Sequence, residues 1–414
     1  MTTQMAENKS CMRILDGSKG EGGGQILRNA IVYASLLKIP IQIHSIRANR
    51  NNPGLRSQHV KGLELAVNIC GGKLTGAKVG SGTVEYHPAK IQYEFEESCD
   101  IISDIGTAGA ITLLLQVAVP CWLFHAHAIK SLELIGGTNA TFAPQIDYFQ
   151  DVLLPTISKH CIFKSNSASF LDFNIKTRGY YPIGKGVVSC SLNKFSEQFN
   201  GTIRPITLMK RGFVTNIHVK CFHAGKIPEF APKIIAKSAM RLINLSSLHE
   251  LSGIQPSIEI IKHEPAVGSA CGIMITAKTS TGCLFGGSAL QNRNEKYEKV
   301  GTRAAQELLD SLSSGGCVDE WLQDQLIIFM ALALGTSKIR TGCLTQHTRT
   351  AINLATEMTG VHFEVLPQHR KSDVASDDLR SEEYGKDGCI YGQHIITCKG
   401  IGLDSDSINT NNMK

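Results

Sequence analysis

The sequence predicts an α/β protein in which one structural unit occurs three times. Three stretches share an order of elements, in which an apolar helix is followed by a short strand, a second helix and further strands. A segment with a different order of elements separates the second stretch from the third. Three α/β units with a smaller α/β insert between units two and three explain this pattern.

The periodicity of apolar residues places the elements of each unit. The first unit is predicted as helix 25–37, strand 41–47, helix 55–70 and strands 73–79 and 83–87. The second is predicted as helix 107–118, strand 121–134, helix 143–160 and strands near 161–177. The third is predicted as helix 319–334, strand 337–342, helix 346–359, strand 361–366 and a strand within 389–400.

The intervening segment also reads as α/β. Its predicted strands are 213–222, 257–262 and 272–277, and its predicted helices are 232–248 and 296–312. We therefore predict a large domain with units one and two at 1–200, an insert domain at 201–313, and unit three at 314–414. Residues 368–388 are dense in charge and poor in apolar groups, which is typical of a mobile loop.

Composition excludes several classes of protein. The chain has 414 residues, of which 42% are hydrophobic and 19% charged, as in ordinary globular proteins. Its 13 cysteines form no CxxC pair, which favours reduced thiols in the cytosol or nucleus. The longest apolar stretch, 108–124, contains Gln116 and Pro120 and is too short to span a bilayer, so we expect no membrane span. The net charge of +6 permits a phosphate-rich partner.

Residues 16–28, DGSKGEGGGQILR, are unusually rich in glycine just before a predicted helix. Exposed backbone N–H groups at a helix start can bind an anion. The segment is not a Walker A loop, because no Gly-Lys-Ser/Thr follows, and it completes no dinucleotide-binding fingerprint. An anion site and a tight glycine turn both explain it.

A basic cluster follows in residues 46–59. Arg47 and Arg50 lie in sequence beside Gln58 and His59, and Arg28 could join them if the first helix packs alongside. Arginine binds phosphate bidentately and stays charged. Any single arginine is better explained as part of a solvated loop, but the cluster beside a glycine-rich segment favours phosphate binding.

Two later segments carry further candidates. Helix 319–334 is nearly all apolar after Leu326, and first-turn acids explain Asp319 and Glu320 but not Asp324 and Gln325. In 341–351, TGCLTQHTRTA, His347 stands at a predicted helix start, where imidazolium is disfavoured. That position is compatible with a histidine nucleophile, although a lone histidine is more often a packed or surface residue.

These segments together resemble the RNA 3′-terminal phosphate cyclase family, eukaryotic type. The resemblance runs from Leu15 to about Gly402. It is carried by DGSKGEGGGQILR, IRANRNNPGLRSQH, GTAGAITLLLQ, GGTNATFAPQIDY, TRGYYPIGKG, STGCLFGGS, VDEWLQDQL and QHTRTAI, in this order. The resemblance implies three repeats, each with two helices on a four-stranded sheet, and an α/β insert between repeats two and three.

The resemblance also implies an activity. ATP would adenylate a histidine, AMP would pass to an RNA 3′-phosphate, and the neighbouring 2′-hydroxyl would close a 2′,3′-cyclic phosphate, with Mg²⁺ or Mn²⁺ neutralising the triphosphate. His347 aligns with the adenylated histidine and Glu21 with a carboxylate near the metal. The nucleotide-contacting positions align with Gln116, Pro144, Trp321, Asp324 and Gln325. The positions for the RNA or ATP phosphates align with Arg28, Arg47, Arg50, Gln58 and His59.

Three other interpretations remain open at this point. A cyclase-like ribosome assembly factor shares the fold but lacks the nucleophilic histidine, which His347 in QHTRTA argues against. An RNA-end-binding protein without turnover and a transferase of the enolpyruvyl type are the others. The resemblance implies an RNA partner with a 3′-phosphate end and a place in the nucleus, with the cytoplasm also open; protein partners are not indicated.

Overall fold

The computed structural model describes residues 12–89, 99–125, 129–162, 169–192, 201–368 and 392–405. Within these ranges the chain forms four β-sheets with helices packed on them, so the predicted α/β class is confirmed. Among the helices that the structure describes, none is both long and apolar enough to cross a membrane.

The first sheet is built by the N-terminal residues. Its elements are β1 (Arg13–Asp16), α1 (Gln25–Leu37), β2 (Ile41–His44), α2 (Ser57–Cys70), β3 (Lys73–Thr75) and β4 (Val84–His87). The predicted helix 25–37 is confirmed. The predicted strand 41–47 ends early at His44, because Ser45 and Arg47 have φ values of 51° and 52°, which do not continue a strand.

The second sheet follows the same order of elements. They are β5 (Cys99–Asp104), α3 (Ile111–Phe124), β6 (Ile129–Gly136), a helical segment of α4 (Ile146–Tyr148), η2 (Phe149–Leu153), α5 (Leu154–Ile157) and η3 (Ser158–Ile162), then β7 (Leu171–Gly179) and β8 (Gly186–Leu192). The predicted change from helix to strand near residue 120 was wrong, because α3 continues through Pro120 to Phe124. Proline removes one backbone hydrogen bond, and burial of all α3 residues except Gln116 outweighs that loss.

The third sheet joins distant parts of the sequence. Its elements are β9 (Thr207–Leu208), α8 (Glu320–Leu332), β15 (Thr336–Thr341), α9 (Gln346–Thr359), β16 (Phe363–Gln368) and β17 (Gln393–Lys399). The predicted helix 346–359 is confirmed. The predicted mobile loop 368–388, apart from Gln368 in β16, lies outside the described residues.

These three sheets share one strand order and one set of strand directions. The orders are β1-β2-β4-β3, β5-β6-β8-β7 and β9-β15-β17-β16. In each sheet the first pair is parallel and the next two pairs are antiparallel. The short strand β12 (Ala266–Val267) adds to the edge of the second sheet beside β7.

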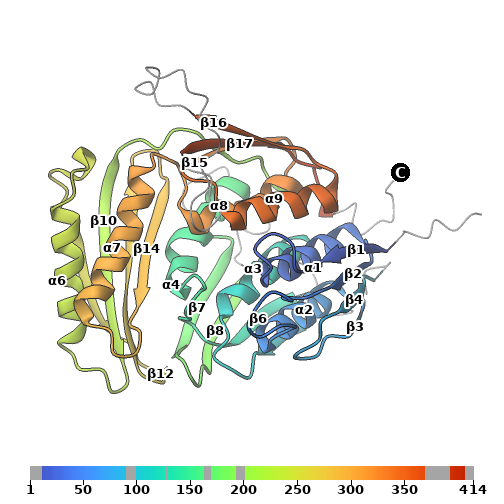
Figure 1. Cartoon of the computed structure of the whole chain (residues 1–414), viewed down its shortest axis with the longest axis horizontal. Helices are drawn as coiled ribbons and strands as arrows, with labels where there is room; N and C mark the ends of the chain where they lie inside the picture. The colour runs from blue at the N-terminus through green and yellow to red at the C-terminus, as the bar shows by residue number, and fades with distance from the viewer. Residues whose placement is uncertain are drawn as a thin grey trace, which may run out of the picture.

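The fourth sheet has a different order, β11-β10-β13-β14. Its elements are β10 (Val214–Ala224), α6 (Ala231–Asn244), β11 (Ser257–Lys262), β13 (Ala270–Thr279), β14 (Leu284–Leu290) and α7 (Tyr297–Ser313), with the short helix η5 (His249–Leu251) between α6 and β11. Helices α6 and α7 pack on each other and on this sheet, at one end of the molecule (Figure 1). The helix predicted to reach 248 ends at Asn244.

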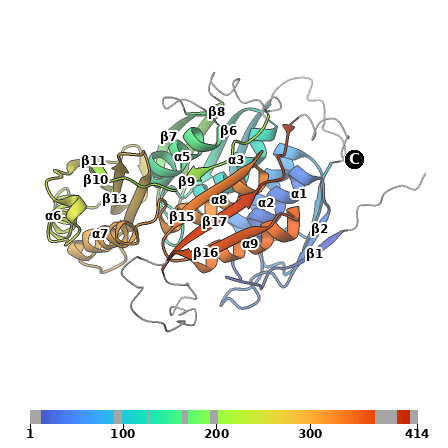
Figure 2. The same cartoon turned by 90° about the horizontal axis from the view of Figure 1, so that it is seen from above.

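Five helices meet between the first three sheets. Helix α1 packs against α2, α3 and α9, and α8 packs against α9. Figure 2 shows the sheet β15–β17–β16 lying over α8 and α9, on the far side of these helices from the molecular centre. Helices from distant parts of the sequence therefore pack together between these sheets.

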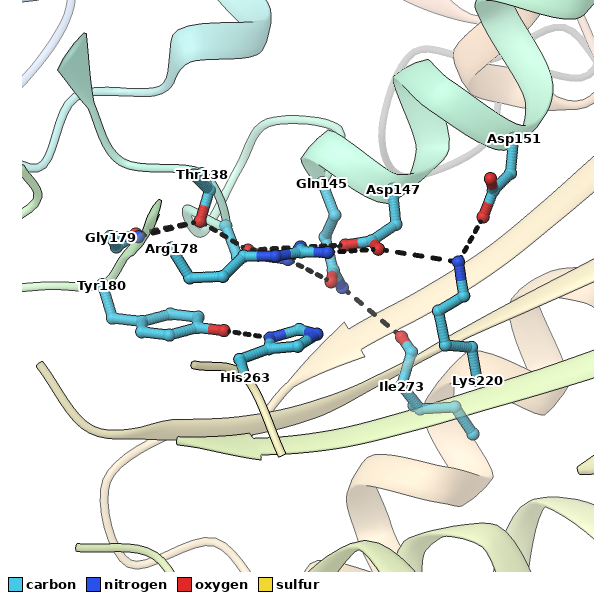
Figure 3. Close-up of polar contacts among 11 residues, drawn as sticks. Thr138, Gln145, Asp147, Asp151, Arg178, Gly179, Tyr180, Lys220, His263 and Ile273 are labelled. Carbon is cyan, nitrogen blue, oxygen red and sulfur yellow. Dashed lines mark hydrogen bonds and ion pairs between the residues drawn. The ribbon is translucent and has the colours of Figure 1, made fainter. Parts of the chain in front are cut away.

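A buried polar network joins the helical segment 146–162 to the fourth sheet (Figure 3). Arg178 donates to both carboxylate oxygens of Asp147, at 2.6 and 2.9 Å, and Lys220 of β10 lies 3.8 Å from Asp147 and 2.9 Å from Asp151. Burial alone would raise the pKa of Asp147, but the hydrogen bonds and charge of Arg178, with Lys220, lower it to about 2. The carboxylate therefore stays ionised and ties β7, α4 and β10 together.

Replacing Asp147 should be costly because two cations would lose their buried partner. We expect Asp147→Asn to lower the free energy of unfolding by about 3–5 kcal/mol at neutral pH, measured by urea denaturation. Because the folded pKa lies below the unfolded value of 3.8, this difference should be present above pH 4 and shrink as the pH falls towards 2.

The exposed pair of Lys176 and Glu133 provides the matched control. Their side chains are 48% and 29% exposed, so Glu133→Gln should change stability by only about 0–1 kcal/mol. Equal effects of the two substitutions on the free energy of unfolding would contradict a large contribution of the Asp147 network to stability.

Candidate active site

The glycine-rich loop 16–24 lies against the start of α9. Gln346 Nε2 donates to the carbonyl oxygen of Gly20 at 3.0 Å, and the Glu21 N–H donates to Thr350 Oγ1 at 3.2 Å. Gly20 and Gly22 have φ values of 60° and 62°, a conformation that side chains strain. The glycines thus let the loop fold back onto a helix that lies more than 300 residues later in the sequence.

His347 is the second residue of α9, beside this loop. Thr345 caps the helix, and its side chain accepts a hydrogen bond from the Thr348 N–H at 3.1 Å. The His347 side chain is exposed, whereas Thr345, Thr348 and Thr350 are buried. The threonines that surround His347 in sequence therefore fix the helix start and leave the imidazole facing outwards.

Gln323 of α8 supports this helix start, although it was not among the predicted site residues. Its Oε1 accepts from Thr348 Oγ1 at 2.8 Å and from the Thr345 N–H at 3.4 Å, while its Nε2 donates to the Cys343 carbonyl at 3.2 Å. A buried glutamine in an apolar helix needs such partners. That rule was the available signal, since Gln323 stands directly before Asp324 and Gln325.

Three charged side chains act on His347. Desolvation of the ring by neighbouring protein atoms lowers its pKa, Glu21 raises it, and Arg28 and Arg50 lower it, so that the net pKa is below the ordinary histidine value. Arg50 forms an ion pair with the Glu21 carboxylate and donates to the Glu21 carbonyl at 2.9 Å. The lowered pKa favours the neutral imidazole, the form in which a ring nitrogen keeps its lone pair.

A chain of hydrogen bonds links residues of four helices, α1, α3, α8 and α7. Arg28 Nε of α1 donates to Gln116 Oε1 of α3 at 2.8 Å, and Gln116 Nε2 donates to Gln325 Oε1 of α8 at 3.0 Å. Gln325 Nε2 donates to the Trp321 carbonyl at 2.5 Å, and the Trp321 indole donates to Glu307 at 2.6 Å. Four of the predicted site residues thus occupy one continuous network.

Asp324 lies beside this chain. Burial raises its pKa to about 7, against the attraction of Arg28, and Gln25 Nε2 donates to its carboxylate at 2.7 Å. Gln25, Gln116, Asp324 and Gln325 line a small pocket between α1, α3 and α8. A buried carboxyl group poised between its two protonation states in a pocket is typical of a functional site.

Pro144 is placed near the same helices by the loop 137–145. Its carbonyl accepts a hydrogen bond from Thr112 Oγ1 of α3 at 2.8 Å, one turn before Gln116. Asn139 and Gln145 of this loop are buried and bonded to each other at 2.9 Å. The loop is thus held at both ends, and Pro144 is buried at the end that joins α3.

The residues of the basic cluster have different roles. His59 caps α2, because its Nδ1 accepts from the Arg56 N–H at 3.0 Å, and burial with nearby arginines lowers its pKa to about 3. A Cβ on Gly24 would lie 2.5 Å from His59 Nε2 and 2.9 Å from Arg28 Nη1, so these groups meet at the start of α1. Arg47 instead donates to carbonyls of its own loop, at 2.7 and 3.1 Å.

Gln58 lies slightly apart from the others. Its Oε1 accepts from the Ala110 N–H at 3.2 Å, so it contacts the turn that precedes α3. The charge of the Glu21 carboxylate acts on both His347 and Arg28, whereas that of Asp324 acts on Arg28. In the described part of the chain no three His, Cys, Asp or Glu side chains gather as a metal site. Glu21 fits a divalent cation that takes most of its ligands from phosphate and water.

Comparison with known proteins places this geometry in a family. The family described as RNA 3′-terminal phosphate cyclase matches residues 19–365. A protein of Dictyostelium discoideum named probable RNA 3′-terminal phosphate cyclase is 37% identical over 410 residues, 98% of this chain and 86% of its own length. The RNA 3′-terminal phosphate cyclase of Drosophila melanogaster is 36% identical over 394 residues, 94% of this chain and 96% of its own length.

An archaeal protein gives the same result. The RNA 3′-terminal phosphate cyclase of Pyrococcus furiosus is 34% identical over 357 residues, which cover 86% of this chain and 95% of that protein. The matched region includes Glu21, the arginines of the basic cluster, the Gln116–Gln325 network and His347. The chain belongs to the RNA 3′-terminal phosphate cyclase family of enzymes.

Proposed function

We propose that this protein converts the 3′-phosphate end of RNA to a 2′,3′-cyclic phosphate at the expense of ATP, with His347 as the residue that carries AMP. One observation carries the proposal most directly. A neutral, exposed imidazole stands at the start of α9 beside Arg50, Glu21 and Arg28. A neutral histidine next to fixed cations is suited to attack a phosphate ester.

The chemistry divides into three displacements at phosphorus. An imidazole nitrogen of His347 attacks the α-phosphate of ATP, and pyrophosphate leaves. A terminal phosphate oxygen of the RNA then attacks the same phosphorus, which frees His347 and gives an RNA-adenylate. Finally the 2′-hydroxyl attacks the RNA phosphate and AMP leaves. Adenylation supplies the leaving group that a phosphate monoester lacks, and the protein mainly positions groups and stabilises charge.

We propose that the nucleoside of ATP binds beside the network of α3 and α8. Gln116 and Gln325 offer amide donors and acceptors, and Asp324, with a pKa of about 7, can present either protonation state. Trp321 provides an aromatic face and Pro144 an apolar one. These groups come from separate units, so binding depends on the packing of α1, α3 and α8.

The phosphates would bind at the meeting point of α1, α2 and α9. Arg28 and Arg50 carry charge there, while His59, Gln58 and Arg47 shape the surrounding loops. Mg²⁺ or Mn²⁺ bound by Glu21 and phosphate would neutralise the triphosphate. Arg50 now pairs with Glu21, and this pair must loosen when an anion enters.

We also propose that the three sheets are copies of one βαβαββ unit. Their common strand order and directions support this. Because β9 pairs with β15 as β1 pairs with β2, the insert would begin after residue 208, inside the third unit. The fourth sheet with α6 and α7 would then be the insert domain, close to the predicted range 201–313.

The first test is covalent labelling. The wild-type protein, given ATP labelled in its α-phosphate and a divalent cation, should form an acid-labile AMP adduct, and RNA with a 3′-phosphate should become resistant to phosphatase. His347→Ala should lose both signals because the attacking nitrogen is gone. An unlabelled wild-type protein, or equal label in the variant, would refute the proposal.

His362→Ala is the matched control for that experiment. His362 is exposed and lies beyond the other end of α9, about 20 Å from His347 along the helix. It should label and turn over as the wild type does.

The second test addresses the charge state of His347. Its pKa in the free protein should lie below 6.5, measured by NMR titration of histidine-labelled protein. Arg50→Gln should raise this pKa, because a repelling cation is lost and Glu21 is left unpaired. The acid limb of adenylation should move upwards in pH by the same amount, because only the neutral imidazole attacks.

Arg56→Gln controls for the loss of a positive charge. Arg56 is an exposed arginine of the same loop, and it is not among the charges that act on His347. Arg56→Gln should leave the pKa of His347 unchanged. A wild-type pKa at or above 6.5, or no response to Arg50→Gln, would show that the arginines do not set the charge of His347.

A further inference from the structure

Two aromatic side chains stand in solvent beside the candidate site without a structural partner for their rings. Phe142 is 95% exposed and Tyr181 is 81% exposed, and Ile183, at 54%, lies two residues from Tyr181. We call these three side chains the aromatic rim. Burying an aromatic ring is strongly favourable, so two rings left in water on adjoining loops call for a ligand.

The loop of Phe142 is fixed although its aromatic ring is not. Ala140 and Ala143 pack with Ala110 and Leu113, and Pro144 is tied to α3 through Thr112. Phe142 between them has a φ of 64°, an outlier for a bulky residue. The protein therefore holds the backbone in a strained conformation that projects the ring outwards instead of packing it.

The loop of Tyr181 begins beside the start of the Phe142 loop. The Thr138 N–H donates to the Gly179 carbonyl at 2.9 Å, and the Gly179 N–H donates to Thr138 Oγ1 at 3.1 Å (Figure 3). Arg178, which directly precedes Gly179, donates a hydrogen bond to Asp147, which follows the Phe142 loop in sequence. The buried network of Figure 3 thus locks the bases of both rim loops together.

Both rim loops reach the phosphate-binding residues through the turn 107–110. A Cβ on Gly184 would lie 2.7 Å from both Ala108 Cα and Thr107 O, so the second loop packs directly on this turn. The Gly137 N–H donates to Gly109 O at 2.7 Å, which joins the first loop to it. Gln58 binds the same turn at Ala110, one residue before His59.

We infer that the aromatic rim is a stacking platform for the unpaired bases of a single-stranded RNA end, an inference that rests on the proposed function. Exposed aromatic rings beside a cationic phosphate site are the usual means of binding single strands without sequence preference. The positive charge for the phosphate comes from the arginines of the candidate site, among them Arg50, which is paired with Glu21; Lys185 of the second rim loop is paired with Asp104 at 2.6 Å. The rim would hold the terminal bases while their 3′-phosphate lies among the arginines.

The test measures RNA affinity separately from adenylation. A short labelled RNA with a 3′-phosphate is titrated by fluorescence anisotropy without ATP. Phe142→Ala and Tyr181→Ala should each bind it roughly 5- to 150-fold more weakly. Phe142→Tyr and Tyr181→Phe should restore binding, because they keep an aromatic face. Phe213→Ala, which removes a 64% exposed ring from the start of the insert, should bind as the wild type does.

A modified RNA tests for stacking itself. An RNA that lacks the bases of its last two nucleotides should bind the wild type more weakly, but the rim variants should discriminate little between this RNA and the intact one. Equal discrimination by wild type and variants, or unchanged RNA affinity in the variants, would overturn the inference and favour a protein partner for the rim.

Covalent labelling tests one further alternative, that the Phe142 ring binds ATP instead of RNA. If Phe142→Ala loses the AMP adduct while its RNA affinity stays normal, the ring belongs to the nucleotide site and the inference is wrong. Absence of the adduct from the wild type itself would instead refute the proposed function. The two failures are therefore distinguishable within one set of proteins.

Discussion

The contact between the glycine-rich loop and the start of α9 is the constraint on which the site depends. It joins Gly20 to Gln346 and Glu21 to Thr350, across 326 and 329 positions of sequence. This contact sets Glu21 and its partner Arg50 against His347, and with α1 packed on α9 it aligns the polar face of α1 with α3 and α8. A loop with side chains in place of its glycines could not approach the helix so closely.

The three sheets that share a strand order each have helices that contribute to the site. Three of these helices supply one member each of the hydrogen-bond chain, Arg28 from α1, Gln116 from α3 and Gln325 from α8. Two other helices begin at the site, with His59 in the first turn of α2 and His347 in that of α9. Only one of these imidazoles is exposed and close to a carboxylate. The other is buried and is used as a helix cap.

Local patterns predicted the helices well, because amphipathic periodicity and caps are properties of short segments. Helices 25–37 and 346–359 were placed correctly, whereas the end of α3 was missed because tertiary burial overrides the signal of Pro120. Asp324 and Gln325 could be marked as unexplained, but their partners could not be named, because these lie on α1 and α3. Gln323 escaped notice for the same reason, since its role exists only once α8 and α9 pack.

The proposed mechanism requires that a nitrogen of His347, and no other atom of the protein, receives AMP. The most direct measurement is site-resolved mass spectrometry of the trapped adduct, prepared under conditions that preserve a phosphorus–nitrogen bond. We predict AMP on His347 alone among the 14 histidines. AMP on His59, on a lysine or on any other residue would contradict it, even if the protein proved able to cyclise RNA ends.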